Sequence, residues 1–468
     1  MKTQEIPPLK AVDHSRDQLL SRSEAIEFGK SLRNKAPRTS HGEWKASNKR
    51  RDPVEILTES SEGRDANLIP IRYGRMLKSP FAFYRGAAGI MAADLAQTPS
   101  TGIYVQSCGD YHLVNFGSYA TPERKVAFDI NDFDETLPAP WEWDVKRLAT
   151  SFVIAAIHNG SSKQEAKKNA IACVESYRRH TTEYAQLSPL EVWYSNISVN
   201  DILDMTKSQG AKKRFTKQLE KAKNKSLTGE DYPKLTNNVN GIVRITDNPP
   251  LIFHRKDVDA EKYFREIEAA FQQYAETLGA EKRILFDQYK FVDMATKVVG
   301  VGSVGRLCGI SLRMTADNEP LFLQVKEATS SVLEPFTRKS AFQNSGQRVV
   351  HGQKLMQAAT DIFLGWGVGV SGRHFYVRQL RDMKIKPLVE VFEEDTMTSY
   401  AELCGWTLAR AHARSGKSTI ISAYLGNSSK FADAIADFSI LYGEQNESDY
   451  AATKKAVADG KLEAYFEE

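Results

Sequence analysis

The stretch from residue 105 to residue 134 constrains this chain most. It starts with apolar residues typical of a strand, passes through the loop Gly109–Asn115, and ends in Asn-Asp-Phe-Asp at 131–134. Between these two polar motifs, Thr121-Pro122-Glu123-Arg124 is typical of a hairpin turn, with short apolar segments on both sides. The sequence therefore predicts a strand, a polar loop and a β-hairpin in immediate succession.

The hairpin is expected to bring polar residues together at one of its ends. If Ala120 pairs with Lys125, Asn115 lies at the open end of the hairpin, where the returning strand finishes. Asp132 follows that strand directly, and Asp110 stands on the loop that leads into the hairpin. We therefore expect Asp110, Asn115 and Asp132 to lie close together.

These residue types at this spacing fit phosphoryl transfer. The Asp110 carboxylate could orient an attacking hydroxyl, while Asn115 and Asp132 could hold Mg²⁺ on the phosphates of a nucleotide. If the hairpin register differs from the expected one, Asp129 and Asp134 are the alternative metal ligands. An ordinary polar loop is the competing interpretation of the Asp-x-His pattern alone.

The same residues carry a resemblance to a known group of enzymes. The loop Gly109–Asn115 resembles the GDxHxxN catalytic loop of the aminoglycoside phosphotransferase and choline kinase group of protein-kinase-like folds. This resemblance implies that His112 belongs to the catalytic loop and stabilises it rather than performing chemistry. It also implies that Asp132 binds the metal and that Asp144 braces the loop.

Most of the chain also resembles a bacterial family described as domain-of-unknown-function family 2252. The stretches that carry this resemblance are Ser79–Gly86, residues 109–117, Asn131–Glu135 and Val325–Glu327. It implies a bacterial protein but brings no established activity.

A second set of motifs begins near residue 297. Val299–Gly305 contains Gly-x-Gly-x-x-Gly, which alone is also compatible with a dinucleotide-binding fingerprint. The residues that follow alternate between apolar and polar in two runs, 310–314 and 321–326, and Asp317-Asn318 supplies a turn between them. A strand pair is therefore expected after the glycines, where a dinucleotide-binding unit would have a helix.

A glycine-rich hairpin followed by a strand that ends in a lysine resembles the nucleotide-binding lobe of kinases. Glycine backbone can approach phosphates closely, and a lysine pairs with them as a point charge. The residues expected to bind the nucleotide are Gly300, Gly302, Ser303, Gly305 and Lys326. The competing interpretation is a plain glycine-rich hairpin with a surface lysine.

The acidic partner of Lys326 is not evident from the sequence. Between Ala328 and Thr360 the only acidic residue is Glu334, and it precedes the predicted helix. The partner is thus Glu334 or none.

The helices predicted from periodicity are Phe81–Leu95, Trp143–His158, Lys163–Gln186, Tyr263–Leu278, Gln347–Phe363 and Tyr400–Ala413.

Three arginines ahead of the loop have two possible roles. Arg72, Arg75 and Arg85 carry guanidinium groups that suit phosphate, and they are equally suited to anchoring the loop by ion pairs. Residues 1–65 are polar and weakly periodic, so we expect a solvated arm that includes the basic patch Lys49-Arg50-Arg51.

The composition argues against several classes of protein, namely nucleic-acid-binding, zinc-binding, disulfide-stabilised and membrane-spanning proteins. The 63 basic residues nearly balance the 59 acidic ones among 468, so nucleic acid is not an expected partner. The four cysteines form no Cys-x-x-Cys pair, which argues against a zinc site or a disulfide framework. Because no long apolar run and no apolar leader are present, we expect a cytoplasmic protein without a membrane span.

The order of the motifs sets the predicted architecture. The catalytic loop precedes the nucleotide-binding hairpin, which reverses the usual kinase order, and joining the chain ends would restore it. We therefore predict an α+β, two-lobed, circularly permuted protein-kinase-like fold. Its expected parts are an arm (1–65), a mainly helical catalytic lobe (66–290), a β-rich nucleotide-binding lobe (291–385) and C-terminal helices that complete the helical lobe (386–468). The alternative is an α+β protein in which the two motifs coincide by chance.

The expected function is an ATP- and Mg²⁺-dependent phosphotransferase acting on an unknown substrate. A nucleotidyl transferase, an ATP-binding pseudokinase that regulates a partner, and a pure interaction module are the alternatives. The architecture requires the loop and the lysine to face one another across a cleft. We therefore expect Lys326 to lie within roughly 15 Å of Asp132, the span that side chains, metal and phosphates can bridge.

Overall fold

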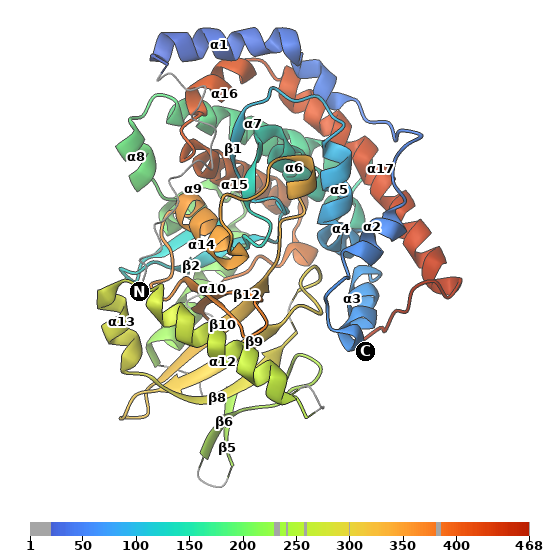
Figure 1. Cartoon of the computed structure of the whole chain (residues 1–468). Helices are drawn as coiled ribbons and strands as arrows, with labels where there is room; N and C mark the ends of the chain where they lie inside the picture. The colour runs from blue at the N-terminus through green and yellow to red at the C-terminus, as the bar shows by residue number, and fades with distance from the viewer. Residues whose placement is uncertain are drawn as a thin grey trace.

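The computed structural model describes residues 20–228, 235–239, 242–256, 260–298, 300–380 and 385–467. Helices and strands combine in an α+β fold, as predicted (Figure 1). The described strands form one six-stranded antiparallel sheet and three two-stranded ones. In these described ranges, every helix is too short or too polar to cross a lipid bilayer.

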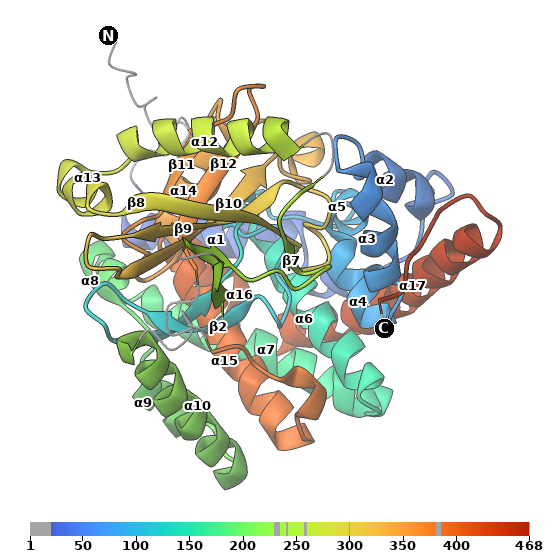
Figure 2. The same cartoon turned by 90° about the horizontal axis from the view of Figure 1, so that it is seen from below.

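The six-stranded sheet has the order β11-β12-β10-β9-β8-β7. Its strands are β7 (Ile252–Phe253), β8 (Lys290–Lys297), β9 (Cys308–Met314), β10 (Pro320–Ala328), β11 (Gly365–Val368) and β12 (His374–Gln379). Helices α12 (Ala260–Glu276) and α13 (Ala280–Asp287) cover one face, where Phe271 and Tyr274 pack against Leu323 and Phe375 (Figure 2). The glycine-rich segment joins β8 to β9, so the predicted glycine hairpin is confirmed.

The helical part of the molecule is built from two segments of the chain, one that precedes the six-stranded sheet in sequence and one that follows it. Helices α6 (Trp141–His158) and α7 (Lys163–Tyr184) precede the sheet, and α15 (Glu394–Ala413), α16 (Ser418–Leu425) and α17 (Lys430–Ala458) follow it. Helix α15 packs against α7, and α17 packs against both α6 and α7. The two segments thus share one apolar core, in which Trp141 and Tyr177 stack.

Short strands and helices surround this core. The polar loop lies between β1 (Tyr104–Ser107) and the hairpin of β2 (Phe116–Ala120) and β3 (Val126–Ile130), and β1 pairs with β4 (Leu137–Pro140). The remaining elements are α3 (Ile69–Met76), α8 (Pro189–Tyr194), α9 (Val199–Met205), α10 (Gln209–Thr228), β5 (Thr236–Val239) and β6 (Ile242–Ile245), with 3₁₀ turns at Arg38–Gly42, Ala66–Leu68, Glu334–Phe336 and Val389–Val391.

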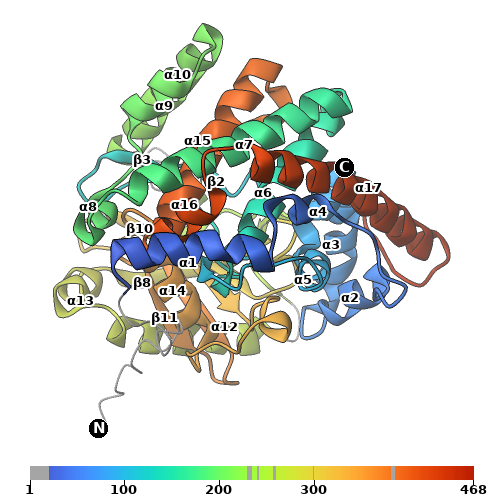
Figure 3. The same cartoon turned by 90° about the horizontal axis from the view of Figure 1, so that it is seen from above.

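Residues 20–65 do not form the expected solvated arm. Helix α1 (Arg22–Lys35) packs along α16, and α2 (Pro53–Glu59) packs against α17 (Figure 3). Arg50, assigned to a solvated basic patch, is largely buried between Asp94 and Asp449, with nitrogen–oxygen distances of 2.6–2.9 Å. The prediction that Arg50 is solvated was wrong because its partners, Asp94 and Asp449, lie far from it along the chain, where the local sequence gives no sign of them. Residues 1–19 of that arm lie outside the described residues.

Two predicted helices are shorter than expected. Residues 81–95 form two helices, α4 (Pro80–Gly86) and α5 (Ala88–Leu95), which separate next to Gly86, a residue type that weakens helices. Helix α14 (Ser345–Met356) ends well before residue 363. There Gln357 leaves the helical conformation, and its side-chain Nε2 donates to the carbonyl of Ile130 at 2.6 Å.

A buried ion pair ties the hairpin to the C-terminal helices. One guanidinium nitrogen of Arg410, on α15, lies 2.8 and 2.7 Å from the two carboxylate oxygens of Asp129, on β3. Both side chains are fully buried. Asp129 also accepts a hydrogen bond from the backbone N–H of Ala358, so three distant segments meet at this carboxylate.

We predict that Asp129→Asn destabilises the protein because it leaves the Arg410 charge buried without a counter-charge. Removing one partner of a buried pair costs about 3–5 kcal/mol, so the free energy of unfolding in urea should fall by that amount. The control is Asp287→Asn, which removes an exposed pair with Arg283 and should cost less than about 1 kcal/mol. Equal losses in the two variants would contradict this role of Asp129.

Candidate functional site

Asp144, in the first turn of α6, holds the loop that carries Asp110. Its carboxylate accepts hydrogen bonds from Ser107 Oγ at 2.6 Å and from the backbone N–H groups of Cys108 at 2.9 Å and Gly109 at 3.2 Å. The same carboxylate lies 3.2 Å from Nε2 of His412 on α15. The predicted bracing role of Asp144 is confirmed.

The hairpin pairs one residue out of the predicted register. Ala120 lies opposite Val126 rather than Lys125, because the loop between the strands contains one residue more. Arg124 adopts a left-handed backbone conformation, φ 61°, which accommodates the extra residue in the turn. Asn115 and Asp132 nevertheless line the same cavity, so the predicted gathering at this end of the hairpin is retained.

Asp110 and its neighbours form a connected loop. The Asp110 carboxylate accepts a hydrogen bond from Nε of Arg147 at 2.9 Å, and Asn115 Nδ2 donates to the Asp110 carbonyl at 2.8 Å. Nε2 of His112 lies 3.8 Å from the same carboxylate. Burial and the charges of Arg85 and Arg147 hold the pKa of His112 well below its usual value, so the ring is neutral.

Lys326, on the central strand β10, reaches the acidic segment after β3. Its Nζ lies 2.6 Å from Asp134 and 3.9 Å from Asp132, so the expected closeness of Lys326 and Asp132 is confirmed. Tyr376 donates its hydroxyl to the Asp134 carboxylate at 2.6 Å. The acidic partner of Lys326 is therefore Asp134, which the sequence did not suggest, and not Glu334.

The two carboxylates differ in their ionisation. Burial and the neighbouring charge of Asp134 raise the pKa of Asp132. Burial acts in the same direction on Asp134, but Lys326 and Tyr376 outweigh it and lower the pKa of Asp134. Burial disfavours the Lys326 charge, yet the two carboxylates raise the pKa of Lys326 well above its usual value. Asp134 and Lys326 thus form a charged pair, beside which Asp132 takes up a proton more readily.

Helix α14 contributes an arginine that the sequence analysis missed. Arg348 donates hydrogen bonds to three backbone carbonyls, those of Asp134 at 2.8 Å, Thr136 at 2.6 Å and Thr329 at 2.8 Å. It thereby fixes the acidic segment to the end of β10. No sequence motif marks this residue, because its role depends on where the helix packs.

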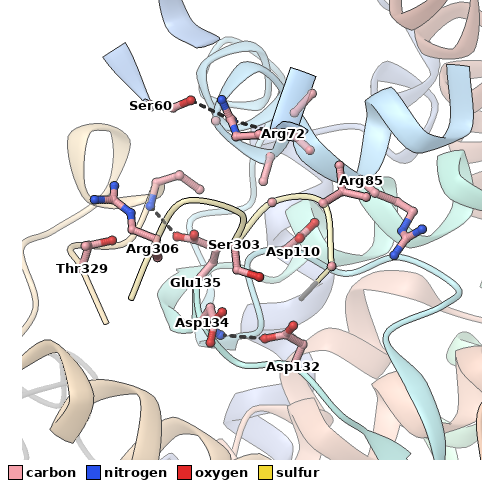
Figure 4. A pocket seen from close by; sticks show the side chains of 18 of the residues that line it. Ser60, Arg72, Arg85, Asp110, Asp132, Asp134, Glu135, Ser303, Arg306 and Thr329 are labelled. Atoms are coloured by element: carbon pink, nitrogen blue, oxygen red, sulfur yellow. Dashed lines mark hydrogen bonds between the residues drawn. The ribbon is translucent and has the colours of Figure 1, made fainter. Parts of the chain in front are cut away.

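Two neighbouring cavities meet at this site. The smaller, called the loop cavity, has a volume of about 130 Å³ and is lined by Asp110 and Asp134 (Figure 4) and by His112. The larger, called the lysine cavity, has a volume of about 840 Å³ and is lined by Lys326. Five residues line both, namely Arg85, Asn115, Asp132, Gly300 and Ser303.

The predicted nucleotide-binding residues are divided between these surfaces. Gly302 lines the loop cavity, and Gly300, with a left-handed φ of 67°, lines both cavities. Gly305 lines neither, since its carbonyl accepts a hydrogen bond from the backbone N–H of Asp65 at 2.7 Å. Asp129, the alternative metal ligand, also lines neither cavity and is paired with Arg410 instead.

We predict that Asp144→Asn loosens the loop, because Cys108 and Gly109 donate to different oxygens of Asp144 and an amide keeps only one acceptor oxygen, so that one of the two N–H groups loses its partner. Losing a hydrogen bond to a charged acceptor costs about 1.5–3 kcal/mol, so amide hydrogen exchange at whichever of the two residues loses its acceptor should accelerate at least about tenfold. Asp437→Asn, at an exposed position on α17, is the control. Unchanged exchange in Asp144→Asn would remove Asp144 as the brace.

Comparison with known proteins supports one assignment. A search of curated proteins and a search of solved structures found no match. Residues 64–456, most of the chain, match the model of a family described as an uncharacterized protein conserved in bacteria (DUF2252). The chain therefore belongs to this bacterial DUF2252 family.

Proposed function

We propose that this protein is an ATP- and Mg²⁺-dependent phosphotransferase with a circularly permuted, kinase-like arrangement of two lobes. The observation that carries this proposal is the position of Lys326 beside the acidic segment, 3.9 Å from Asp132 and 2.6 Å from Asp134. A strand lysine, a glycine loop and an Asp–Asn loop, distant in sequence, thus border one pair of cavities.

The lysine cavity suits a nucleotide. Its volume of about 840 Å³ lies within the range of roughly 300–1,000 Å³ common for small-molecule sites. Lys326 and the backbone of Gly300 border it together, where they would hold phosphates. Ile362 and Leu380 supply apolar lining at which a base would pack.

The donor set suits Mg²⁺. Within the described ranges, no group of three His, Cys, Asp or Glu side chains is placed to hold a metal ion. Mg²⁺ does not need one, since it is commonly held by one or two carboxylates together with waters and substrate phosphates. Asp132 and the side-chain oxygen of Asn115 would be the protein ligands, because Asn115 uses its Nδ2 on the Asp110 carbonyl. The ion would neutralise charge on the phosphates.

Asp110 would orient the acceptor hydroxyl and receive its proton. Its carboxylate lines the loop cavity, while Arg147 fixes its orientation from behind. Neutral His112 would pack beside it without exchanging protons. Positioning and charge neutralisation then account for most of the rate, as is usual for phosphoryl transfer.

We predict that Asp110→Asn abolishes phosphoryl transfer and leaves MgATP binding within about twofold of wild type, because Asp110 lines only the loop cavity. Transfer is measured with γ-labelled ATP and binding by titration calorimetry. A turnover near that of wild type would remove Asp110 from the chemistry.

The label also separates the alternative functions. Incorporation from α-labelled rather than γ-labelled ATP would replace the kinase proposal with nucleotidyl transfer. MgATP binding without incorporation from either label would instead favour a pseudokinase.

We predict that Lys326→Met and Asp132→Ala each weaken MgATP binding by about ten- to a hundredfold, since each removes a charged contact to the phosphates or the metal. In the double variant the losses should not add, because both residues act through one bound nucleotide. Titration calorimetry on the four proteins of this cycle measures the coupling. Strictly additive losses in affinity would contradict a shared nucleotide site.

A further inference from the structure

Four arginines line the loop cavity, each from a different part of the chain. Arg64 follows α2, Arg72 lies on α3, Arg85 on α4, and Arg306 on the glycine-rich segment between β8 and β9. Figure 4 shows Arg72, Arg85 and Arg306 around the same space as Asp110 and Ser303. Arg72 and Arg85 stand out in the sequence ahead of the loop, whereas no motif marks Arg64 or Arg306.

These arginines bond mainly to neutral groups. Arg64 donates to the carbonyls of Ser60 at 2.8 Å and Val304 at 2.6 Å. Arg72 donates to the hydroxyls of Ser60 and Ser61, both at 2.9 Å. Arg306 donates to a backbone carbonyl at 3.2 Å. The Nε atoms of Arg72 and Arg85 are buried without an acceptor among the residues that the structure describes, and Arg72 is only 1% exposed.

Five carboxylates line the same cavity, those of Asp110, Asp132, Asp134, Glu135 and Glu327, and three of them are paired with cations other than the four arginines. Asp110 is paired with Arg147, Asp134 with Lys326 and Glu327 with Arg373. None of the four cavity arginines forms an ion pair with a carboxylate in the parts of the chain that the structure describes. The four arginines therefore have no carboxylate at contact distance in those parts of the chain, although Glu135 and Glu327 favour the charged forms of Arg64 and Arg306 from further away.

Two of the cavity arginines, Arg64 and Arg72, have lowered pKa values. Burial and the charges of Arg72 and Arg306 lower the pKa of Arg64 to about 8. Burial lowers the pKa of Arg72 to about 10. Like charges in a partly buried space repel one another, and an anion in their midst would relieve that repulsion.

We propose that the loop cavity is the acceptor site and that it takes a small hydroxylated molecule bearing a phosphate or carboxylate group. This inference rests on the proposed phosphotransferase function. Asp110 lines the loop cavity and not the lysine cavity, so an acceptor hydroxyl beside Asp110 must lie in the loop cavity. The arginine forks match the planar or tetrahedral oxygens of such an anion.

The two cavities then carry the two reactants. The acceptor hydroxyl oxygen forms a bond to the γ-phosphorus of ATP, and the bond from that phosphorus to the bridging β–γ oxygen breaks. The hydroxyl proton passes to Asp110, and the products are ADP and the phosphorylated acceptor. The γ-phosphoryl group passes from the lysine cavity to the loop cavity beside Asn115, Asp132 and Ser303, which line both cavities.

The test is direct anion binding, with inorganic phosphate and malonate as probes in titration calorimetry at low ionic strength. Arg306→Gln should weaken binding of the better probe at least about tenfold, since it removes a charged contact. Arg64→Gln is a second variant with the same expected loss. Arg265→Gln, exposed on α12, is the matched control and should not change the affinity.

Two further measurements locate the anion. Lys297→Met should keep the phosphate affinity within about twofold, because Lys297 lines only the lysine cavity. Arg306→Gln should keep MgATP affinity within about twofold. If MgATP affinity falls as much as phosphate affinity, the arginines bind the nucleotide and the acceptor assignment is overturned.

The remaining outcomes separate this inference from the proposed function. If neither probe binds, or if both arginine variants bind as wild type does, the anion site is overturned whatever the protein does with ATP. If the arginine variants lose phosphate binding while wild type fails to bind MgATP, the anion site stands and the phosphotransferase proposal fails.

Discussion

Lys326 and Asp134 form an ion pair, 2.6 Å long, between the central strand of the six-stranded sheet and the segment that leaves the β2–β3 hairpin. Tyr376 bonds the same carboxylate from the neighbouring strand, and Arg348 holds the adjoining backbone from α14. A shift of the sheet relative to the hairpin would therefore break several charged contacts at once. Besides this junction, hydrogen bonds from Arg75 to the Gly300 carbonyl and from Arg64 to the Val304 carbonyl hold the glycine-rich segment, which lines both cavities.

At this junction the carboxylates of Asp132 and Asp134, two residues apart in sequence, differ in how readily they bind a proton. Asp134 remains ionised as the partner of Lys326, whereas burial and that neighbouring charge make Asp132 the one that more readily accepts a proton. Burial and the charge of Asp134 raise the pKa of Asp132 more than Lys326 and Arg378 lower it, so a further positive charge at Asp132 would be favourable. A divalent cation beside Asp132 would meet this need, which links the electrostatics of the free protein to the proposed nucleotide complex.

The parts of the site that could be predicted from sequence are those set by local chemistry. Turn residues, strand alternation and glycine spacing are local signals, so the Asp110 loop, the hairpin and the glycine-rich strand pair were found. The register was missed because it depended on the left-handed conformation of one residue, Arg124. Arg147, Arg348 and Arg306 were missed because their positions depend on packing between distant elements, and the burial of Arg50 was missed for the same reason.

The bond between Asp144 and His412 has a consequence for the biosynthesis of the protein. Asp144 braces the loop before the sheet, but His412 and Arg410, which fix Asp144 and Asp129 from behind, lie on a helix translated after the sheet. A nascent chain that has reached only the end of β12 thus lacks the supports of its own loop. We therefore expect the loop to be fully braced only after α15 has left the ribosome and packed against α7, and truncated translation products to lack these supports.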